Sequence, residues 1–239
     1  MTFEAGLLAG RHALVTGGTQ GIGSAIANQL AALGARVTAV GLDGGDGSLA
    51  PAVEVRHADV AAETSVRSML AGIDALDIVV NCAGIIRRGA EHELAVFEQV
   101  IAVNLTGTMR VCSAARDALK ARRGCIVNMA SMLSFFGGGL VPGYAASKGG
   151  IAQLTKSLAI AYAPDGIRVN AVAPGWIATP LTQALQDDPA RAGPILARTP
   201  LGRWGTPDDV ARATLFLCTP AAAFITGVIL PVDGGYLVG

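Results

Sequence analysis

Residues His12 to Gly23 read HALVTGGTQGIG, the stretch of this chain that decides its fold. The first four residues form a short apolar run that predicts a buried strand, and apolar residues then recur at helical spacing from Ile22 until Gly34 ends the helix. Glycines at positions 17, 21 and 23 let backbone N–H groups and a helix N-terminus approach a pyrophosphate. The spacing differs from the generic G-x-G-x-x-G fingerprint, and a glycine-rich turn without a ligand stays open.

Outward from this stretch, strand-length apolar runs alternate with helical patterns. Further strands are predicted at 36–40, 53–56, 77–80, 125–130, 168–173 and 228–232, with helices at about 96–119, 144–162 and 207–217. Little chain separates the second strand from the third, so a helix there is short or absent. The alternation predicts an α/β fold, a doubly wound parallel seven-stranded sheet with helices on both faces (Rossmann-type), in a single domain of residues 1–239. Residues 181–204, with weak periodicity and several prolines, are predicted to form a mobile substrate lid.

Composition narrows the class of partner. Hydrophobic residues make up 51% of the 239 residues and charged residues 15%, which fits a sheet covered on both faces and a subunit interface. Eighteen basic and 18 acidic residues balance without a like-charge block, so no nucleic acid is expected as partner. No segment reaches the ~20 apolar residues of a membrane span, and the N-terminus lacks a secretory pattern, so the prediction is a cytoplasmic protein with a small-molecule substrate.

The four cysteines are widely spaced, without a C-x-x-C pair. Neither a metal site nor a disulfide framework is predicted from that spacing, and reduced apolar side chains are the simpler interpretation.

Four polar residues are candidates for a functional role because of where they lie in the predicted strands and helices. Tyr144 and Lys148 are four residues apart on a predicted helix and therefore share a face, where the ammonium favours tyrosinate. Ser131 ends the fifth strand, thirteen residues before Tyr144. Asn104 lies in the middle of a predicted helix, where asparagine is unfavourable.

In order and spacing, the motifs resemble the short-chain dehydrogenase/reductase family over essentially the whole chain. They are Thr16-Gly17-x-x-x-Gly21-Ile22-Gly23, Asp59, Asn81-x-Ala83-Gly84, Asn104, Ser131, Tyr144-x-x-x-Lys148 and Pro174-Gly175. The resemblance implies that Tyr144 is the general acid/base and that Lys148 binds the nicotinamide ribose and lowers the Tyr144 pKa. It also implies that Ser131 hydrogen-bonds the substrate oxygen and that Asn104 holds a water relaying protons to Lys148.

The resemblance further implies a nicotinamide dinucleotide. Two departures from the family pattern bear on it, because Cys82 stands where many relatives have a second Asn, and Gly41 stands where many have the ribose-binding Asp. Asp43 is the substitute, and an acidic loop without a cation favours NAD over NADP. Asp59 either caps the next helix or contacts adenine, and Thr179 holds the carboxamide. The predicted cofactor set is Gly17, Thr19, Gln20, Gly21, Ile22, Gly23, Asp43, Asp59, Val60, Asn81, Ala83, Gly84, Tyr144, Lys148, Pro174, Gly175, Ile177 and Thr179.

Three segments look like the 2-deoxy-D-gluconate 3-dehydrogenase branch of the family: 84–88, 130–135 and 202–205. One of two adjacent arginines would then pair with a sugar-acid carboxylate, while solvated surface arginines remain the alternative. The predicted substrate set is Arg87, Arg88, Ser131, Leu133, Tyr144 and Trp176. A 3-oxoacyl-thioester reductase and a catalytically silent dinucleotide sensor stay open as other functions. Family resemblance and apolar composition together predict a homotetramer.

Overall fold

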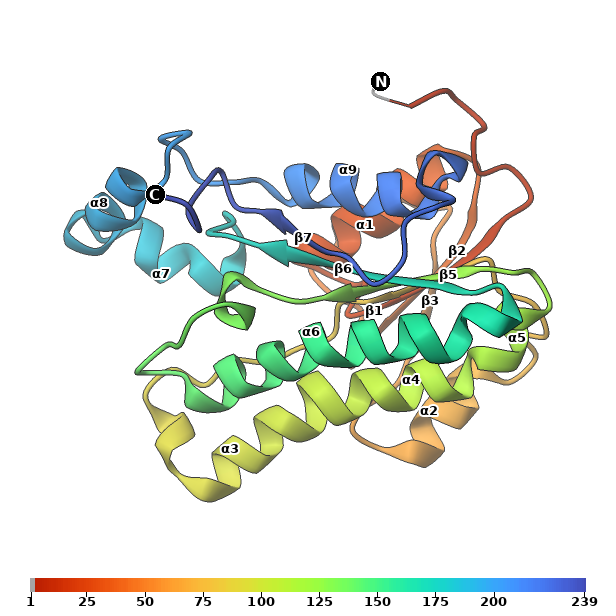
Figure 1. Cartoon of the computed structure of the whole chain (residues 1–239), viewed down its shortest axis with the longest axis horizontal. Helices are drawn as coiled ribbons and strands as arrows, with labels where there is room; N and C mark the ends of the chain where they lie inside the picture. The colour runs from red at the N-terminus through yellow and green to blue at the C-terminus, as the bar shows by residue number, and fades with distance from the viewer. Residues whose placement is uncertain (1–2) are drawn as a thin grey trace.

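The computed structural model describes residues 3–239, and its centre is one wholly parallel seven-stranded sheet (Figure 1). The strand order is β3-β2-β1-β4-β5-β6-β7, so the direction of winding reverses between β1 and β4. Ligands of such sheets bind outside the carboxyl ends of the strands at this reversal. The strands are β1 (His12–Thr16), β2 (Arg36–Gly41), β3 (Glu54–His57), β4 (Ile78–Asn81), β5 (Cys125–Met129), β6 (Arg168–Pro174) and β7 (Ile229–Val232).

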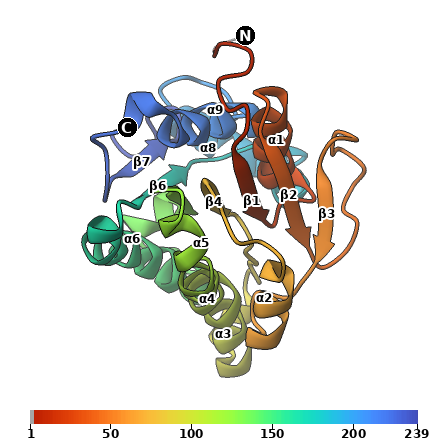
Figure 2. The same cartoon turned by 90° about the vertical axis from the view of Figure 1, so that its right-hand side faces the viewer.

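Helices cover both faces of the sheet, as predicted (Figure 2). One face packs against α1 (Gly21–Ala32) and α9 (Pro207–Cys218). The other packs against the helices between β3 and β6, of which α6 is the longest. These are α2 (Glu63–Leu70), α3 (Leu94–Ile101), α4 (Thr108–Ala114), α5 (Arg116–Lys120) and α6 (Pro142–Tyr162). Five 3₁₀ turns complete the fold: Ala90–His92, Met132–Ser134, Ala163–Asp165, Pro180–Thr182 and Pro220–Ala222.

The chain passes from β2 to β3 without a helix, as the sequence predicts. Asn28 on α1 holds this crossing, since its Nδ2 donates to Ser48 O at 2.8 Å and its Oδ1 accepts from Ala50 N at 2.7 Å. One side chain thereby satisfies two backbone groups that a helix would otherwise have paired.

The predicted continuous helix over 96–119 is wrong in one respect. The run is divided into α3, a π-helical turn at Ala102–Gly107, α4 and α5. The Thr108 hydroxyl donates to Asn104 O at 2.8 Å, and the Asn104 side chain bonds outside the helix. Side-chain competition of this kind loosens the i to i−4 ladder.

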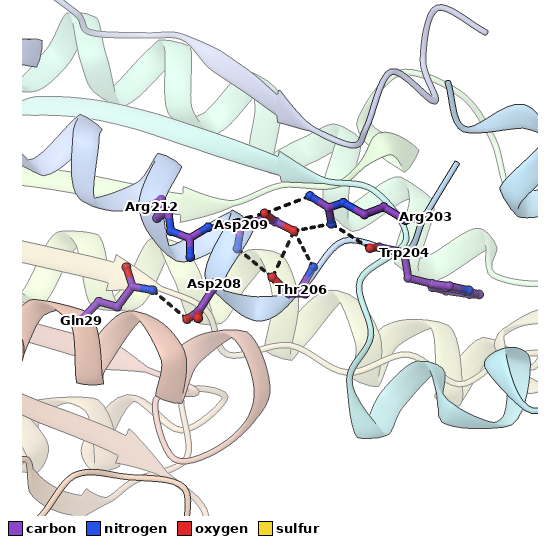
Figure 3. A network of polar contacts seen from close by, with 7 residues as sticks. All are labelled: Gln29, Arg203, Trp204, Thr206, Asp208, Asp209 and Arg212. Carbon is purple, nitrogen blue, oxygen red and sulfur yellow. Dashed lines mark hydrogen bonds and ion pairs between the residues drawn. The ribbon is translucent and has the colours of Figure 1, made fainter. Parts of the chain in front are cut away.

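The predicted lid region holds α7 (Gln183–Gln186) and α8 (Pro189–Arg198), which lie beyond the carboxyl ends of the strands (Figure 1). Its far end is fastened at the start of α9 (Figure 3). Arg203 Nη1 and Nη2 donate to the two carboxylate oxygens of Asp209 at 2.7 and 3.2 Å. Thr206 Oγ1 accepts from Asp209 N at 3.2 Å, and Thr206 N donates back to the Asp209 carboxylate at 2.8 Å, which forms a capping box.

Within residues 3–239, no helix has the length and apolar composition needed to cross a membrane.

Candidate active site

A cavity of about 430 Å³ opens at the carboxyl ends of β1, β2, β4 and β5, where the sheet reverses its winding. Its volume lies in the range typical of small-molecule and cofactor sites. It is lined by Gly17, Thr19, Gln20, Gly21, Ile22, Gly23, Val40, Gly41, Leu42, Asp43, Ala58, Asp59, Val60, Cys82, Ala83, Gly84, Ile85, Val103, Met129, Tyr144, Lys148, Thr179, Pro180 and Leu181.

The glycine loop fits a dinucleotide pyrophosphate. A Cβ on Gly17 would lie 2.6 Å from Ala83 N, so the loop packs directly on the end of β4, and Gly17 has φ +62°. Gly21 has φ +57°, and a Cβ there would meet only Thr179 Cγ2, at 4.0 Å. The N-cap residue Gln20 makes no side-chain hydrogen bond to the first turn of α1. The N-cap side chain therefore leaves the backbone N–H groups of this first turn of α1 available to an anion.

The end of the cavity beside β2 explains why Gly41 stands where many relatives have an aspartate. A Cβ at Gly41 would overlap Thr19 Oγ1, so Thr19 fills the space that an acidic side chain would use. Asp43 lines the cavity two residues later, and its Oδ1 accepts from Gly45 N at 3.0 Å. Among the described residues that line the cavity, Lys148 is the only lysine or arginine.

Tyr144 and Lys148 meet the same cavity from α6. Lys148 is only 4% exposed, and its Nζ donates to Met129 O at 2.6 Å. Burial lowers the pKa of Lys148 to about 8, and Cys82 opposes part of that change. Burial raises the pKa of Tyr144 to about 12, while a hydrogen bond with Ser131 lowers it in part.

The predicted lowering of the Tyr144 pKa is therefore corrected. The ammonium of Lys148 lies 5.4 Å from the centre of the Tyr144 ring and points at a carbonyl on β5, so desolvation outweighs its attraction for the phenolate.

The amide of Asn104 fastens the loop that follows β4. Oδ1 accepts from Ile85 N at 2.8 Å, and Nδ2 donates to Ile85 O at 2.9 Å and to Ser147 Oγ at 3.1 Å. A Cβ on Gly84 would lie 3.4 Å from Asn104 Oδ1 and 3.8 Å from Lys148 Nζ. Asn104, the end of β4 and Lys148 therefore form one packed unit, which accounts for an asparagine within this helical run.

Ser131 is oriented by the turn that it begins. Its Oγ accepts from Leu133 N at 3.2 Å, and its own N–H donates to Ser134 Oγ at 3.3 Å. Ser134 Oγ in turn donates to Lys148 O at 2.6 Å. The position of the Ser131 hydroxyl is thereby tied to the helix that carries Tyr144 and Lys148.

Asp59 does not cap the helix that follows it. Helix α2 has Ala62 as its N-cap residue, and Asp59 Oδ1 instead accepts from Ala61 N at 2.8 Å. Asp59 is exposed at the cavity wall.

Some predicted residues lie outside the lining. Asn81 is buried and donates to Asn128 Oδ1 at 2.9 Å, and Ile177 packs where a Cβ on Gly205 would fall. Of the predicted substrate set, only Tyr144 lines this cavity. The predicted residues outside the lining are Asn81, Arg87, Arg88, Asn104, Ser131, Leu133, Pro174, Gly175, Trp176 and Ile177.

Sequence reasoning missed three contributors. Met129 acts through its main-chain carbonyl, and Ser147 bonds the Asn104 amide. Glu91 is buried and accepts from Tyr144 N. A main-chain carbonyl leaves no mark on the residue type, and a single glutamate in a loop looks like an ordinary surface residue.

Comparisons with known proteins agree with this geometry. A family model described as "Enoyl-(Acyl carrier protein) reductase" matches residues 17–237. A 2-dehydro-3-deoxy-D-gluconate 5-dehydrogenase of Pseudoalteromonas atlantica is 41% identical over 246 residues, covering 96% of this chain and 97% of the relative. A 3-oxoacyl-(acyl-carrier-protein) reductase of Chlamydia trachomatis is 38% identical over 250 residues, covering 96% and 98%. The crystal structure of a candidate 2-deoxy-D-gluconate 3-dehydrogenase of Agrobacterium tumefaciens, with bound NADP, is 41% identical and superposes with a TM-score of 0.88 over 99% of this chain and 100% of that one.

Proposed function

The chain belongs to the short-chain dehydrogenase/reductase family, and we propose that it exchanges a secondary alcohol at C3 or C5 of a six-carbon deoxy or keto-deoxy sugar acid with a ketone, using NAD. The observation that carries the proposal is the meeting of Tyr144 and Lys148 with a pyrophosphate-binding glycine loop in one cavity. A catalytically silent dinucleotide sensor would have no use for that pair, so an enzyme is the better conclusion.

The chemistry needs few groups from the protein. A bound nicotinamide dinucleotide supplies or accepts the hydride. Tyr144 exchanges the proton at its phenol oxygen with the substrate oxygen, and the Ser131 hydroxyl donates to the same oxygen as negative charge develops there. Lys148 adds a cation beside the nicotinamide ribose, and Asn104 holds the water that relays protons to Lys148. The glycine loop and the neighbouring strand ends would hold the dinucleotide through those predicted residues that line the cavity, with Thr179 toward the carboxamide.

NAD is proposed over NADP from the ribose end of the cavity. Thr19 and Gly41 leave Asp43 as the acidic group there, and Lys148, the only lysine or arginine among the described lining residues, points instead at Met129 O on β5. The Agrobacterium relative was solved with NADP, so the proposed preference for NAD rests on this chain's own loop and not on the relatives.

The sugar-acid substrate is supported by relatives and by charge. The Pseudoalteromonas relative is named for a keto-deoxy sugar acid, and Arg87 and Arg88 are exposed two and three residues beyond Ile85, which lines the cavity. A bidentate arginine contact is the usual way to hold a carboxylate. Reduction of a 3-oxoacyl thioester is the competing function, because a relative of 38% identity carries that name.

The test compares a panel of sugar acids, their neutral alditols and acetoacetyl thioester with NAD(H) and NADP(H), in the wild type, Arg87→Ala and Arg88→Ala. Loss of a charge-assisted contact costs about 1.5 to 3 kcal/mol, so the correct arginine variant should lower kcat/KM for the acid roughly 10-fold to 150-fold and leave the alditol unchanged. If neither variant separates acid from alditol, or if the thioester is reduced far faster than any acid, the acyl-thioester function replaces this one.

We also propose a cytoplasmic homotetramer. All four cysteines are free thiols, and the thiols of Cys125 and Cys218 share a hydrogen bond. Reduced thiols fit a reducing compartment. Leu94 on α3 and Ile160 on α6 expose 70% and 78% of their surface, which fits an interface formed by these neighbouring helices.

A further inference from the structure

Glu91 is a buried carboxylate in a loop, where a glutamate is ordinarily exposed. It lies in the 3₁₀ turn at Ala90–His92 and is only 1% exposed. Ionised carboxylates are rarely buried this deeply unless hydrogen bonds compensate for lost hydration. A buried Glu between two loops of an active site therefore needs a structural or functional reason.

Both carboxylate oxygens of Glu91 are used, and each binds a different loop. Oε1 accepts from Arg87 N at 2.7 Å, and Oε2 accepts from Tyr144 N at 2.7 Å. Hydrogen bonds of this length from backbone N–H groups to a carboxylate are of the strong, charge-assisted kind. One side chain thus joins the start of the arginine pair to the residue that carries the phenol.

Helix α6 needs this carboxylate because its own N-cap residue cannot supply an acceptor. The N-cap position is Val141, which makes no side-chain hydrogen bond, and Tyr144 is the third residue of the helix. Backbone N–H groups of a first turn have no partner within the helix. Glu91 supplies the acceptor from another segment, and its negative charge is favourably placed at a helix N-terminus.

The surroundings of Glu91 are built tightly around this arrangement. A Cβ on Gly143 would lie 3.3 Å from Glu91 Oε2 and 3.2 Å from Phe97 Cδ2, so a side chain at 143 would displace the carboxylate. Two more contacts join the same loops, because Gly89 N donates to Leu140 O at 2.8 Å and His92 Nε2 lies 2.9 Å from Gly139 O.

We propose that Glu91 is a positioning residue that holds the backbone of Tyr144 and the start of the Arg87–Arg88 loop in a fixed relation, so that the substrate is bound in register with the group that exchanges its proton. This inference rests on the proposed function. Glu91 touches neither of the reacting oxygens in this role. It acts through the two backbone N–H groups that it binds and through its charge.

The charge of Glu91 affects the pKa of Tyr144, which a residue that only fills space would not do. The titratable groups facing Tyr144 are Lys148 from the same helix, Cys82 from the end of β4, and Glu91, whose charge raises the pKa of the phenol. Removing that charge should lower the pH at which Tyr144 titrates, while Tyr144 keeps its other neighbours.

The test uses Glu91→Gln, Glu91→Asp and a control, Glu98→Gln. Glutamine keeps the size but has one acceptor oxygen, so one buried N–H loses its partner. Aspartate keeps the charge but is too short to reach both N–H groups. Glu98 on α3 is exposed, so its replacement removes the same charge from the surface.

Glu91→Gln should lower kcat/KM for the sugar acid about 5-fold to 150-fold, the loss expected when a buried donor loses its acceptor. The titration of Tyr144, followed by tyrosinate absorbance with Tyr144→Phe subtracted, should move to lower pH, because one neighbouring negative charge that raises the pKa of the phenol is removed. Glu91→Asp should lose efficiency with an almost unchanged titration. Glu98→Gln should match the wild type in both, and all variants should bind the dinucleotide normally.

An unchanged titration and efficiency in Glu91→Gln would overturn the proposal. So would a loss of thermal stability and dinucleotide binding in both Glu91 variants that fully accounts for the lost activity, because that outcome assigns Glu91 to folding alone. If the wild type oxidises no sugar acid, the proposed substrate fails, and the titration of Tyr144 still decides whether Glu91 acts on the phenol.

Discussion

Burying the ammonium of Lys148 lowers the stability of the folded protein, although the proposed function needs that cation in the site. Its ammonium is buried with one hydrogen bond in the folded protein, which lowers its pKa from 10.5 to about 8. Below pH 8 both states are protonated and the folded state carries the full cost of burying the charge. Between about 8 and 10.5 the unfolded state binds more protons, so stability rises with pH over that interval.

Lys148→Met should therefore raise the free energy of unfolding by about 1 to 3 kcal/mol at pH 7, after allowing for the lost bond to Met129. The gain should shrink as pH rises through 8 toward 10.5, and dinucleotide binding should weaken. Urea unfolding at matched protein concentration and several pH values measures both trends. A variant less stable than the wild type at neutral pH would show that the burial cost is not present.

The choice of dinucleotide is also decided by single residues. A 2′-phosphate beside Asp43 without a cation combines repulsion with lost ribose hydrogen bonds. If this costs roughly 2 to 4 kcal/mol, NAD should be preferred in kcat/KM on the order of 30-fold to 1,000-fold. Asp43→Asn should narrow that preference by removing the repulsion, while Asp74→Asn, an exposed aspartate before β4 at the amino ends of the strands, serves as a control. Equal efficiency with NADP in the wild type would mean that Asp43 points away from the ribose.

Among the elements, α9 depends on the polar network at its N-terminus (Figure 3). Hydrogen bonds from Arg203, followed by those from Thr206, hold the pKa of Asp209 at about 2, below its ordinary value of 3.8. A carboxyl with a depressed pKa stabilises the fold fully above pH 3.8, and the contribution is lost as pH falls through about 2.

Asp209→Asn should lower the free energy of unfolding by about 1 to 2 kcal/mol at pH 7, the usual cost of a lost helix cap with an added ion pair. The difference from wild type should narrow as pH falls toward 2. Asp208→Asn is the matched control, because Asp208 is exposed and bonds only Gln29 Nε2, at 2.7 Å. Equal melting temperatures for the two variants would rule out the network as a source of stability at the start of α9.

The elements also show what a sequence can predict. The seven strands and the helices α1, α6 and α9 follow from apolar runs and their periods, and each was predicted within a few residues. The π-helical turn at Ala102–Gly107 was not predicted, and the Asn104 side chain within it bonds Ile85, nineteen residues away in the sequence. The residue pattern marks Asn104 as unusual, and only the fold supplies its partner.

At the scale of the whole molecule, the apolar exposure of α3 and α6 predicts assembly. Ile160→Lys places a charge in the exposed apolar surface of α6 and should convert the tetramer to a smaller species at micromolar concentration, as measured by light scattering. Arg191→Glu, an exposed charge change on α8 and away from α3 and α6, should not. A wild-type monomer would contradict the proposed assembly.

The order of the sheet decides which predicted residues meet. The sequence placed Gly17, Ala83, Tyr144 and Lys148 at strand ends or helix starts, and the reversal between β1 and β4 brings them to one cavity. The Tyr144 pKa could not be predicted in the same way. It depends on how deeply α6 buries the phenol and on where the Lys148 ammonium points, and neither follows from a spacing of four residues.

The most direct measurement compares nicotinamide oxidation and reduction by the wild type and Tyr144→Phe, with a sugar acid as substrate and dinucleotide binding measured on the same samples. Removing the phenol oxygen takes away the proton donor and leaves the ring packing, so turnover should fall by at least the ~10² that general acid/base catalysis supplies, with melting temperature and dinucleotide affinity unchanged. Near-normal turnover in Tyr144→Phe would contradict the assignment of Tyr144 as the group that exchanges the proton.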